Sequence, residues 1–263
     1  MKRFTQGAVG VLLLFLLTAC GSGGASSENA DGFKLIKDGE LVFASSGEFK
    51  PFSVTAADGK MTGFDIEVGE AIAQELGLEP VQKKMKFGSI VESVKAGRVD
   101  AAIASHTITE ERLEHVSFST PYYYSGPQIF VRPDSSVEKL ADLEGLEIAV
   151  SKGSTYEENA ASISTNIIFY DSDVTALEAL NRGKHDAVIT DFVTGKEAIG
   201  AGMEIEGKEL LGKSEQAIAV AKDNEALLKK INEALQTLKE NGTLAEISKK
   251  YIGEDITVLP EES

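Results

Sequence analysis

A nine-residue unit occurs twice in this chain, as GRVDAAIAS at 97–105 and as GKHDAVITD at 183–191. In each copy a glycine follows a helical pattern, and the Asp-Ala pair leads into an apolar run typical of a buried strand. Two copies of a helix end and a strand predict two similar α/β lobes, each with its own core. The copies finish in different residues, Ser105 and Asp191. Both are expected at the carboxyl ends of parallel strands, where open α/β sheets bind ligands.

Strand and helix patterns alternate through both halves of the chain. Strands are predicted at 41–46, 99–104, 146–151 and 187–190, and helices at 64–77, 89–96, 153–162 and 173–182. This alternation favours parallel sheets with helices on both faces. Two more helices are predicted at 224–240 and 244–251, and periodicity does not place them in either lobe.

Length, charge and motifs limit the possible functions. A chain of 263 residues is long enough for two lobes, and its formal net charge of −16 disfavours a nucleic-acid partner. Its three histidines, His106, His115 and His185, show no spacing typical of a metal site. Neither a GxSxG motif nor a phosphate-binding loop occurs. We therefore expect no metal, no cofactor and no catalytic site.

The first twenty residues are typical of an export signal. Lys2 and Arg3 precede an apolar run at 8–17, which is too short to cross a bilayer of roughly 30 Å as a helix. LTAC at 17–20 then resembles the lipobox of bacterial lipoproteins, and Cys20 is the only cysteine. We expect a signal peptide at 1–19, a lipidated (palmitoylated) Cys20 that anchors the protein to the cell membrane, and a flexible tether at 20–34.

Arg112 is the most informative charged residue. In ASHTITEER at 104–112, Thr109 has the pattern of a helix N-cap, and Glu110 and Glu111 follow it. A cation in the first turn opposes the helix dipole unless an anion lies opposite it. One alternative is an exposed Arg112 that pairs with Glu111 or Glu114. The other is an Arg112 whose guanidinium group binds a carboxylate through two parallel hydrogen bonds.

Motifs along almost all of the expected mature chain resemble the solute-binding proteins of bacterial ABC importers for polar amino acids. They are PF, TGFD and EVGEAIAQELG within 51–77, AGRVDAAIASHTITEER at 96–112, FSTPYYYSG at 118–126, LEGLEIAVSKGST at 143–155, GKHDAVITD at 183–191 and LKENGTLAEISKKYIGEDI at 238–256. The resemblance implies the periplasmic binding protein type II fold, two Rossmann-like α/β lobes joined by two crossing hinge segments.

The resemblance also implies boundaries and partners. Lobe 1 is expected at 35–124 plus 222–257 and lobe 2 at 125–221, with crossings near 125–131 and 216–221. The protein is expected to be an extracytoplasmic monomer and not an enzyme. It is expected to bind a polar amino acid and deliver it to an ABC transporter permease.

The same resemblance assigns roles to five polar residues. Arg112 is expected to hold the α-carboxylate, with the N–H and hydroxyl of Thr107 and the N–H of Thr155 at a helix start. Asp191 and the carbonyl of Ser105 are expected to hold the α-ammonium group. Taken alone, Asp191 is more often a solvated turn acid or an N-cap for the following helix.

Phe49 and Phe87 stand where the family has aromatic walls for the ligand side chain, although a phenylalanine alone is more often a core residue. Many relatives carry an acid at the position of Ser46, and here the nearest acid is Glu48. The sequence therefore leaves glutamine, cystine, arginine and other polar ligands open.

Two other functions share this fold. A few dehydratases have the same two lobes, and so do some extracellular sensor domains. The pairing of Arg112 with Asp191 matches a zwitterion and favours an amino-acid receptor over a dehydratase. The absence of a transmembrane helix or kinase before Ser263 counts against a sensor.

Overall fold

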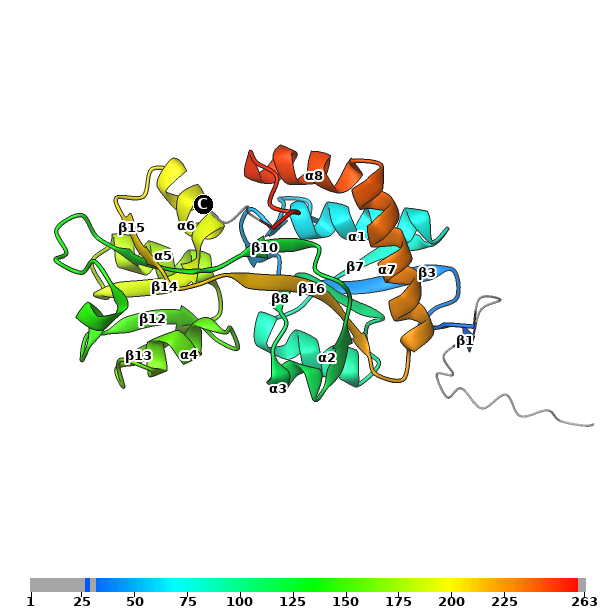
Figure 1. Cartoon of the computed structure of the whole chain (residues 1–263), viewed down its shortest axis with the longest axis horizontal. Coiled ribbons are helices and arrows are strands. Elements are labelled where there is room, and N and C mark those ends of the chain that lie inside the picture. Colours follow the sequence, from blue (N-terminus) through cyan, green and yellow to red (C-terminus); the bar gives the residue numbers. More distant parts are fainter. Residues whose placement is uncertain (1–26, 29–31, 260–263) are drawn as a thin grey trace, which may run out of the picture.

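The computed structural model describes residues 27–28 and 32–259. The predicted signal peptide, Cys20 and most of the predicted tether lie outside these residues. Figure 1 shows two lobes side by side, each with a sheet between helices. Within the described residues, no helix combines the length and the apolar composition that crossing a membrane requires.

The first lobe is built on a six-stranded sheet in the order β10-β16-β8-β3-β7, with β9 paired to β16. Its strands are β3 (Glu40–Ser45), β7 (Glu79–Lys84), β8 (Ala101–Thr107), β9 (Val116–Phe118), β10 (Tyr123–Ser125) and β16 (Ser214–Ala221). β3 is parallel to β7 and β8, whereas β16 is antiparallel to β8, β9 and β10. The expected parallel sheet is therefore mixed, because the chain returns from the second lobe as β16 and inserts beside β8.

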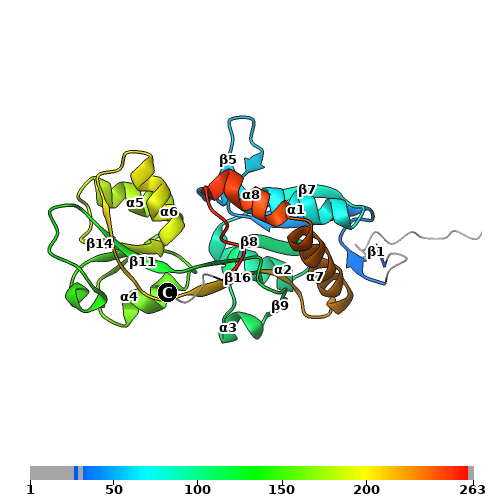
Figure 2. The ribbon, with the colours of Figure 1, turned by 45° about the horizontal axis from the view of Figure 1, so that its top comes forward.

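Helices cover both faces of this sheet (Figure 2). α1 (Phe64–Glu75), α7 (Glu225–Glu240) and α8 (Thr243–Ile252) lie on one face, and α2 (Ile90–Lys95) lies on the other. Successive residues of β3 point to opposite faces, so Phe43 packs in the core under α1 and Val42 in the core over α2. The two C-terminal helices thus pack on the first lobe.

Shorter elements surround the sheet of the first lobe. β4 (Glu48–Phe49), β5 (Ser53–Thr55) and β6 (Met61–Thr62) form a small antiparallel sheet, and β1 (Ser27–Glu28) pairs with β2 (Lys34–Leu35). The 3-10 helix η1 (Phe87–Ser89) follows β7, and the single turn α3 (Glu110–Leu113) follows β8.

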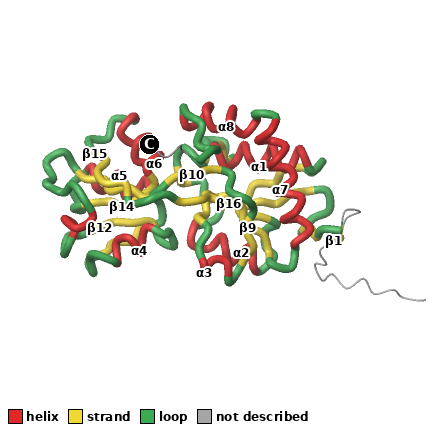
Figure 3. The backbone as a smooth tube through the Cα atoms, in the orientation of Figure 1, coloured by secondary structure: helices red, strands yellow, loops and turns green. Residues whose placement is uncertain are grey.

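The second lobe has a five-stranded sheet in the order β13-β12-β14-β11-β15. Its strands are β11 (Pro127–Val131), β12 (Ile148–Ser151), β13 (Ile167–Tyr170), β14 (Ala187–Asp191) and β15 (Glu206–Leu210). η2 (Leu140–Leu143) and α4 (Tyr156–Ala161) pack on one face, and α5 (Asp173–Asn181) and α6 (Phe192–Gly200) pack on the other. Figure 3 shows the strands of this lobe between its helices.

The chain crosses between the lobes twice, and the two crossings lie side by side. The first passes through Gly126 between β10 and β11, and the second through 211–213 between β15 and β16. Tyr124 pairs with Glu215 on the first-lobe side, and the N–H of Leu211 donates to Pro127 O at 2.8 Å on the other. The second crossing was expected at 216–221, which is wrong. The apolar run of β16 would suit either lobe, and its pairing with β8 places it in the first.

Both copies of the repeated unit form the predicted structure. Gly97 and Gly183 have φ of 64° and 77°, the left-handed region expected where a helix ends. The strands that follow, β8 and β14, are central in their sheets and nearly all of their residues are buried.

Candidate functional site

A cleft lies between the two lobes, and residues of both lobes line it. Its lining comes from Ser46, Glu48, Phe49, Phe87, Ser105, Thr107 and Arg112 of the first lobe and from Ser151, Ser154, Thr155, Tyr156, Asp171, Ser172 and Asp173 of the second. Six of the seven residues that the sequence placed in the ligand site are among them. The seventh, Asp191, is not.

Arg112 reaches across the cleft from the turn that follows β8. Its Nη1 donates to Thr107 O at 2.8 Å and its Nη2 to Gly153 O of the other lobe at 3.0 Å. The guanidinium carbon lies 5.8 Å from the centre of the Phe87 ring. Burial lowers the pKa of Arg112. No acidic side chain of the described residues lies within ion-pair distance of Arg112, and its side-chain hydrogen bonds go to carbonyl oxygens.

The helix that carries Arg112 is too short to have the helix dipole that the sequence analysis assumed. Thr109 caps α3 as predicted, its hydroxyl oxygen accepting from Arg112 N at 3.2 Å. However, α3 has four residues, so Arg112 also lies in its last turn. A single turn has no developed dipole, and the expectation that Arg112 opposes one is wrong. The side chain is held by Thr107 O and Gly153 O instead.

Thr155 lies at the N-terminus of α4, as predicted, and faces the first lobe across the cleft. The loop before it is shaped by Ser154, whose hydroxyl donates to Ser151 O at 2.7 Å at the end of β12. This places the start of α4 and the Arg112 guanidinium on the same lining, where an anionic group could meet both.

Asp191 is almost fully buried beside the cleft at the end of β14, with 1% of its surface exposed. Its Oδ2 accepts from Ser125 Oγ at 2.5 Å, and its Oδ1 accepts from Val193 N at 2.9 Å and caps α6. Burial raises the pKa of Asp191 to about 7. The alternative in which Asp191 is an N-cap is therefore realised, and Asp191 lies buried behind the lining at the carboxyl end of β14.

Asp173 is an acidic residue of the lining that the sequence analysis missed. It lies at the first position of α5, and its Oδ1 accepts from Ser151 Oγ at 2.8 Å and from Thr190 Oγ1 at 2.6 Å. Burial raises its pKa. A sequence signal was present, since DSD at 171–173 follows the end of β13, but a Ser-Asp pair is equally typical of an ordinary helix start.

The two phenylalanines line the cleft from different elements. Phe49 in β4 stacks on Phe52, with ring centres 4.9 Å apart, and Phe87 in η1 stacks on His106 at 4.5 Å. Both are half-buried and present part of their surface to the cleft. They are therefore placed to contact an apolar portion of a ligand.

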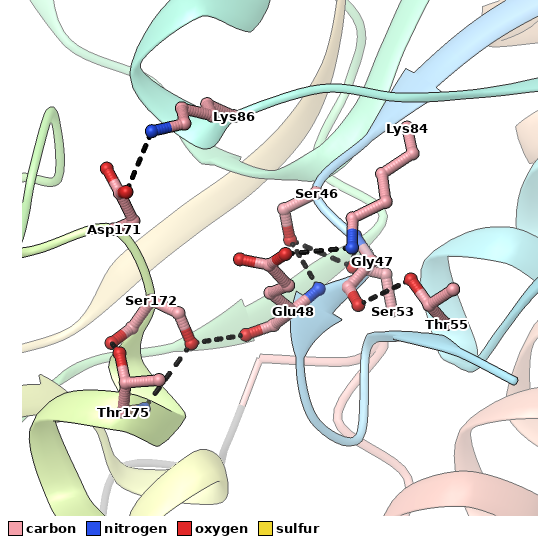
Figure 4. Close-up of polar contacts among 10 residues, drawn as sticks. All are labelled: Ser46, Gly47, Glu48, Ser53, Thr55, Lys84, Lys86, Asp171, Ser172 and Thr175. Atoms are coloured by element: carbon pink, nitrogen blue, oxygen red, sulfur yellow. Dashed lines mark hydrogen bonds and ion pairs between the residues drawn. The ribbon is translucent and has the colours of Figure 1, made fainter.

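The lobes touch directly at one end of the cleft, which Figure 4 shows. Ser172 Oγ donates to Glu48 O at 3.0 Å, and Lys86 pairs with Asp171 at 2.8 Å. Glu48 pairs within its own lobe with Lys84 at 2.8 Å. These contacts close the cleft at this end, and the structure is that of a closed conformation.

Ser46 is engaged within its own lobe at the same end. Its hydroxyl lies 3.1 Å from Ser53 Oγ and accepts from Glu48 N at 3.3 Å (Figure 4). Ser46 thus supports the turn that carries Glu48 and Phe49, while part of it still lines the cleft.

Known proteins resemble this chain in both sequence and structure. The model of a family described as "Bacterial extracellular solute-binding proteins, family 3" matches residues 41–254. The L-cystine-binding protein TcyJ of Escherichia coli K12 is 32% identical over 233 residues, which cover 85% of this chain and 86% of that protein. Among solved structures, an ancestral arginine-binding protein bound to glutamine has a TM-score of 0.76 and 35% identity over 83% of this chain and 100% of its own.

One solved relative bears on the enzyme alternative. The ancestral amino-acid-binding protein AncCDT-1, described as a precursor of cyclohexadienyl dehydratase, has a TM-score of 0.76 and 28% identity. The match covers 81% of this chain and 96% of that one.

Proposed function

This chain belongs to family 3 of the bacterial extracellular solute-binding proteins, whose members similar to it bind amino acids for ABC transporters, and from this premise we propose how it works. It captures a polar L-amino acid in the cleft between its lobes, outside the cytoplasm. It then delivers this ligand to the permease of an ABC transporter. The ligand is bound and released unchanged.

The observation that carries this proposal is the arrangement of charge in the cleft. The first lobe contributes Arg112, which has no acidic partner among the described residues, and the second contributes Asp173 in the lining and Asp191 behind it. A free α-amino acid has one carboxylate and one ammonium group, so it can satisfy both sides at once. Arg112 is therefore assigned to the α-carboxylate, because its planar fork suits two parallel hydrogen bonds.

We propose the remaining roles from the resemblance to the family. Thr107 and the N–H of Thr155 complete the carboxylate site from the two lobes. Asp191 and the carbonyl of Ser105 take the ammonium group, and Phe49 and Phe87 flank the ligand side chain. TcyJ is named for cystine, and solved relatives are bound to glutamine or arginine, so these three amino acids are the first ligands to test.

A dehydratase is the second candidate, because a structural neighbour is described as the precursor of one. The opposite charges on the two lobes favour a zwitterion that is held without reaction. Incubation of the protein with each of the twenty amino acids and with the substrate of that dehydratase, followed by NMR, separates the two. Conversion of any of them would contradict the transport role.

The first prediction concerns Arg112. Replacing Arg112 with Ala should weaken binding of L-cystine, L-glutamine or L-arginine, whichever the wild type binds, by about 30-fold to several thousand-fold. Truncating one partner of a buried charge pair costs roughly 2–5 kcal/mol. Arg182→Ala is the matched control, since Arg182 is exposed and pairs with Glu178 one turn away. Isothermal titration calorimetry measures both, and binding by Arg112→Ala within about threefold of wild type would remove Arg112 from the site.

The second prediction concerns Cys20. We propose that this residue is lipidated and holds a monomeric protein at the outer surface of the cell membrane, close to its permease. Support comes from the lipobox-like LTAC at 17–20 and from the extracellular family. Cys20→Ala should move the protein from the membrane fraction to the soluble extracytoplasmic fraction, and Ser22→Ala should not. Retention of Cys20→Ala in membranes after a high-salt wash would exclude the anchor.

A further inference from the structure

Ser105 has an uncommon backbone conformation at the centre of the first-lobe half of the cleft. Its φ is 59°, and it is the only residue besides glycine with a positive φ within the described part of the chain. A residue other than glycine in this region is strained, by about 1–3 kcal/mol. A conformation of this kind persists only where the surrounding structure holds it.

A β-bulge produces this conformation. Along β8 and β16, Ala217 pairs with His106 and Ala219 pairs with Ala102, so residues 103–105 face Ile218 alone. Ile218 forms its own backbone bonds elsewhere, because its N–H donates to Ser119 Oγ at 3.0 Å and its carbonyl accepts from Ser119 N at 2.9 Å. Ser105 therefore needs partners outside the sheet.

Two buried side chains supply those partners. Ser105 N donates to the hydroxyl of Tyr122 at 3.0 Å, and Ser105 Oγ donates to Asp65 Oδ2 at 2.8 Å. The ring closes because Tyr122 Oη donates to Asp65 Oδ1 at 2.6 Å. Asp65 and Tyr122 are both fully buried, and neither lines the cleft. Burial raises the pKa of Asp65 to about 6, so the carboxylate can accept both hydroxyls at neutral pH.

The residues after Ser105 depend on its conformation. His106 stacks under Phe87, and the carbonyl of Thr107 accepts from Arg112 Nη1 at 2.8 Å. A rotation at Ser105 would therefore shift its own carbonyl, the wall formed by Phe87 and the support of Arg112 together. TGFD at 62–65 and STPYYYSG at 119–126 supply the two buried partners, and the ligand site gives neither Asp65 nor Tyr122 a contact role.

We propose that Asp65 and Tyr122 are positioning residues that lock Ser105 in its left-handed conformation and thereby hold the first-lobe half of the ligand site ready for binding. Both act through Ser105 and not on the ligand. This inference rests on the proposed function, because affinity for an amino acid is its main readout.

The test compares two neighbouring buried tyrosines. Tyr122→Phe removes a hydroxyl of the lock and keeps the ring, which stacks on Phe64. Tyr123→Phe is the matched control, because it also removes a buried tyrosine hydroxyl but none of the three hydrogen bonds that join Ser105, Tyr122 and Asp65. Calorimetry with L-cystine, L-glutamine and L-arginine should show a loss of about 5- to 150-fold for Tyr122→Phe, the range that matches roughly 1–3 kcal/mol of backbone strain. Tyr123→Phe should stay within about threefold of wild type.

Ser105→Gly then separates positioning from a general structural effect. Glycine adopts positive φ without strain. In the Ser105→Gly background, Tyr122→Phe should therefore lower the affinity for the amino acid by less than about threefold. Ser105→Gly should also bind several-fold more tightly than Ser105→Ala, which remains strained. An equal loss from Tyr122→Phe in both backgrounds would overturn the lock, and so would equal affinities for the Ala and Gly variants. The Ala and Gly pair decides the question even if Tyr122→Phe does not fold.

A readout without ligand keeps this inference separate from the proposed function. If the wild type binds none of the three amino acids, the proposed function fails for them. The lock is then judged on crystal structures of Tyr122→Phe and Ser105→Ala. A change of φ at residue 105 out of the left-handed region in either variant supports it, and a positive φ kept in both overturns it.

Discussion

At the scale of single residues, the second lobe offers two carboxylates where an α-amino acid brings one ammonium group, Asp173 in the lining of the cleft and Asp191 buried behind it. Asp191 has both oxygens occupied, by Ser125 Oγ and by Val193 N. Asp173 accepts its two hydroxyl hydrogen bonds at Oδ1 and lines the cleft directly. The two acids are close enough for the charge of Asp173 to raise the pKa of Asp191 further. Titration can therefore show which acid meets the ammonium group.

We expect affinity for the amino acid to increase with pH between about pH 5 and 7. In the empty closed cleft, burial raises the pKa of Asp191 to about 7, and an ammonium group favours the ionised carboxylate. Below that pKa, binding must remove a proton from Asp191, which costs about 1.4 kcal/mol or tenfold in affinity per pH unit. Above it this cost disappears, so the affinity should level off.

Calorimetry across this pH range, in two buffers with different ionisation enthalpies, measures both the affinity and the protons released. Asp191→Asn should abolish the pH dependence, whereas Asp173→Asn should retain it. If only Asp173→Asn lost the pH dependence of affinity, Asp173 and not Asp191 would be the residue that binds the ammonium group. A wild-type affinity that is constant over the whole range would exclude a titrating ammonium acceptor at either position.

At the scale of elements, Gly126 sets the contact between the two crossing strands. A Cβ at this position would lie 2.1 Å from Gly212 O, a distance that real Cβ atoms do not tolerate. Gly126→Ala must push the crossings apart and disturb the bonds from Phe192 N to Gly126 O and from Leu211 N to Pro127 O. We expect the free energy of unfolding to decrease by about 1–3 kcal/mol, as for other overpacked sites.

Urea denaturation measures this change, and Gly200→Ala is its control. Gly200 ends α6, and a Cβ at this position would have nothing within 4 Å, so alanine there has room and suits the helix. Equal stability of Gly126→Ala and wild type would mean that the crossings separate at no cost.

The elements also show what a single sequence can predict. The helices after Gly63 and Ser172 and the strands β3, β8, β12 and β14 follow from apolar periodicity and turn glycines, which are local signals. The insertion of β16 beside β8 does not, because an apolar strand carries no mark of its partner. The six cleft residues came from a family pattern. Asp173 and the lock on Ser105 lay beyond it, because both depend on side chains that meet only after folding.

At the scale of the whole molecule, the ion pairs that join the two lobes are individually weak. Lys86 pairs with Asp171, Lys50 with Glu197 and Lys196 with Glu254 between the lobes, and each pair is largely exposed. Exposed ion pairs contribute about 0–1 kcal/mol each. Without ligand, the closed form leaves Arg112, Asp173 and Asp191 hydrogen-bonded but without an ion-pair partner among the described residues. The ligand can supply those partners, so it should favour the closed form through its higher affinity for it.

Gly88 offers a way to block closure without touching the ligand. It lies in η1 of the first lobe, and a Cβ there would lie 3.3 Å from Lys152 O of the second lobe. A leucine side chain at position 88 is too large for the space between η1 and Lys152 O in the closed form. It would be exposed to solvent when the lobes are apart, so both lobes of Gly88→Leu should fold normally. Small-angle scattering should show the radius of gyration of the wild type decrease with saturating amino acid, that of Gly88→Leu stay constant, and that of Gly200→Leu follow the wild type. Binding by Gly88→Leu should be weaker, because its lobes cannot satisfy both charges of one ligand together. A decrease in Gly88→Leu equal to that of the wild type would show that closure does not bring η1 against the loop at Gly153.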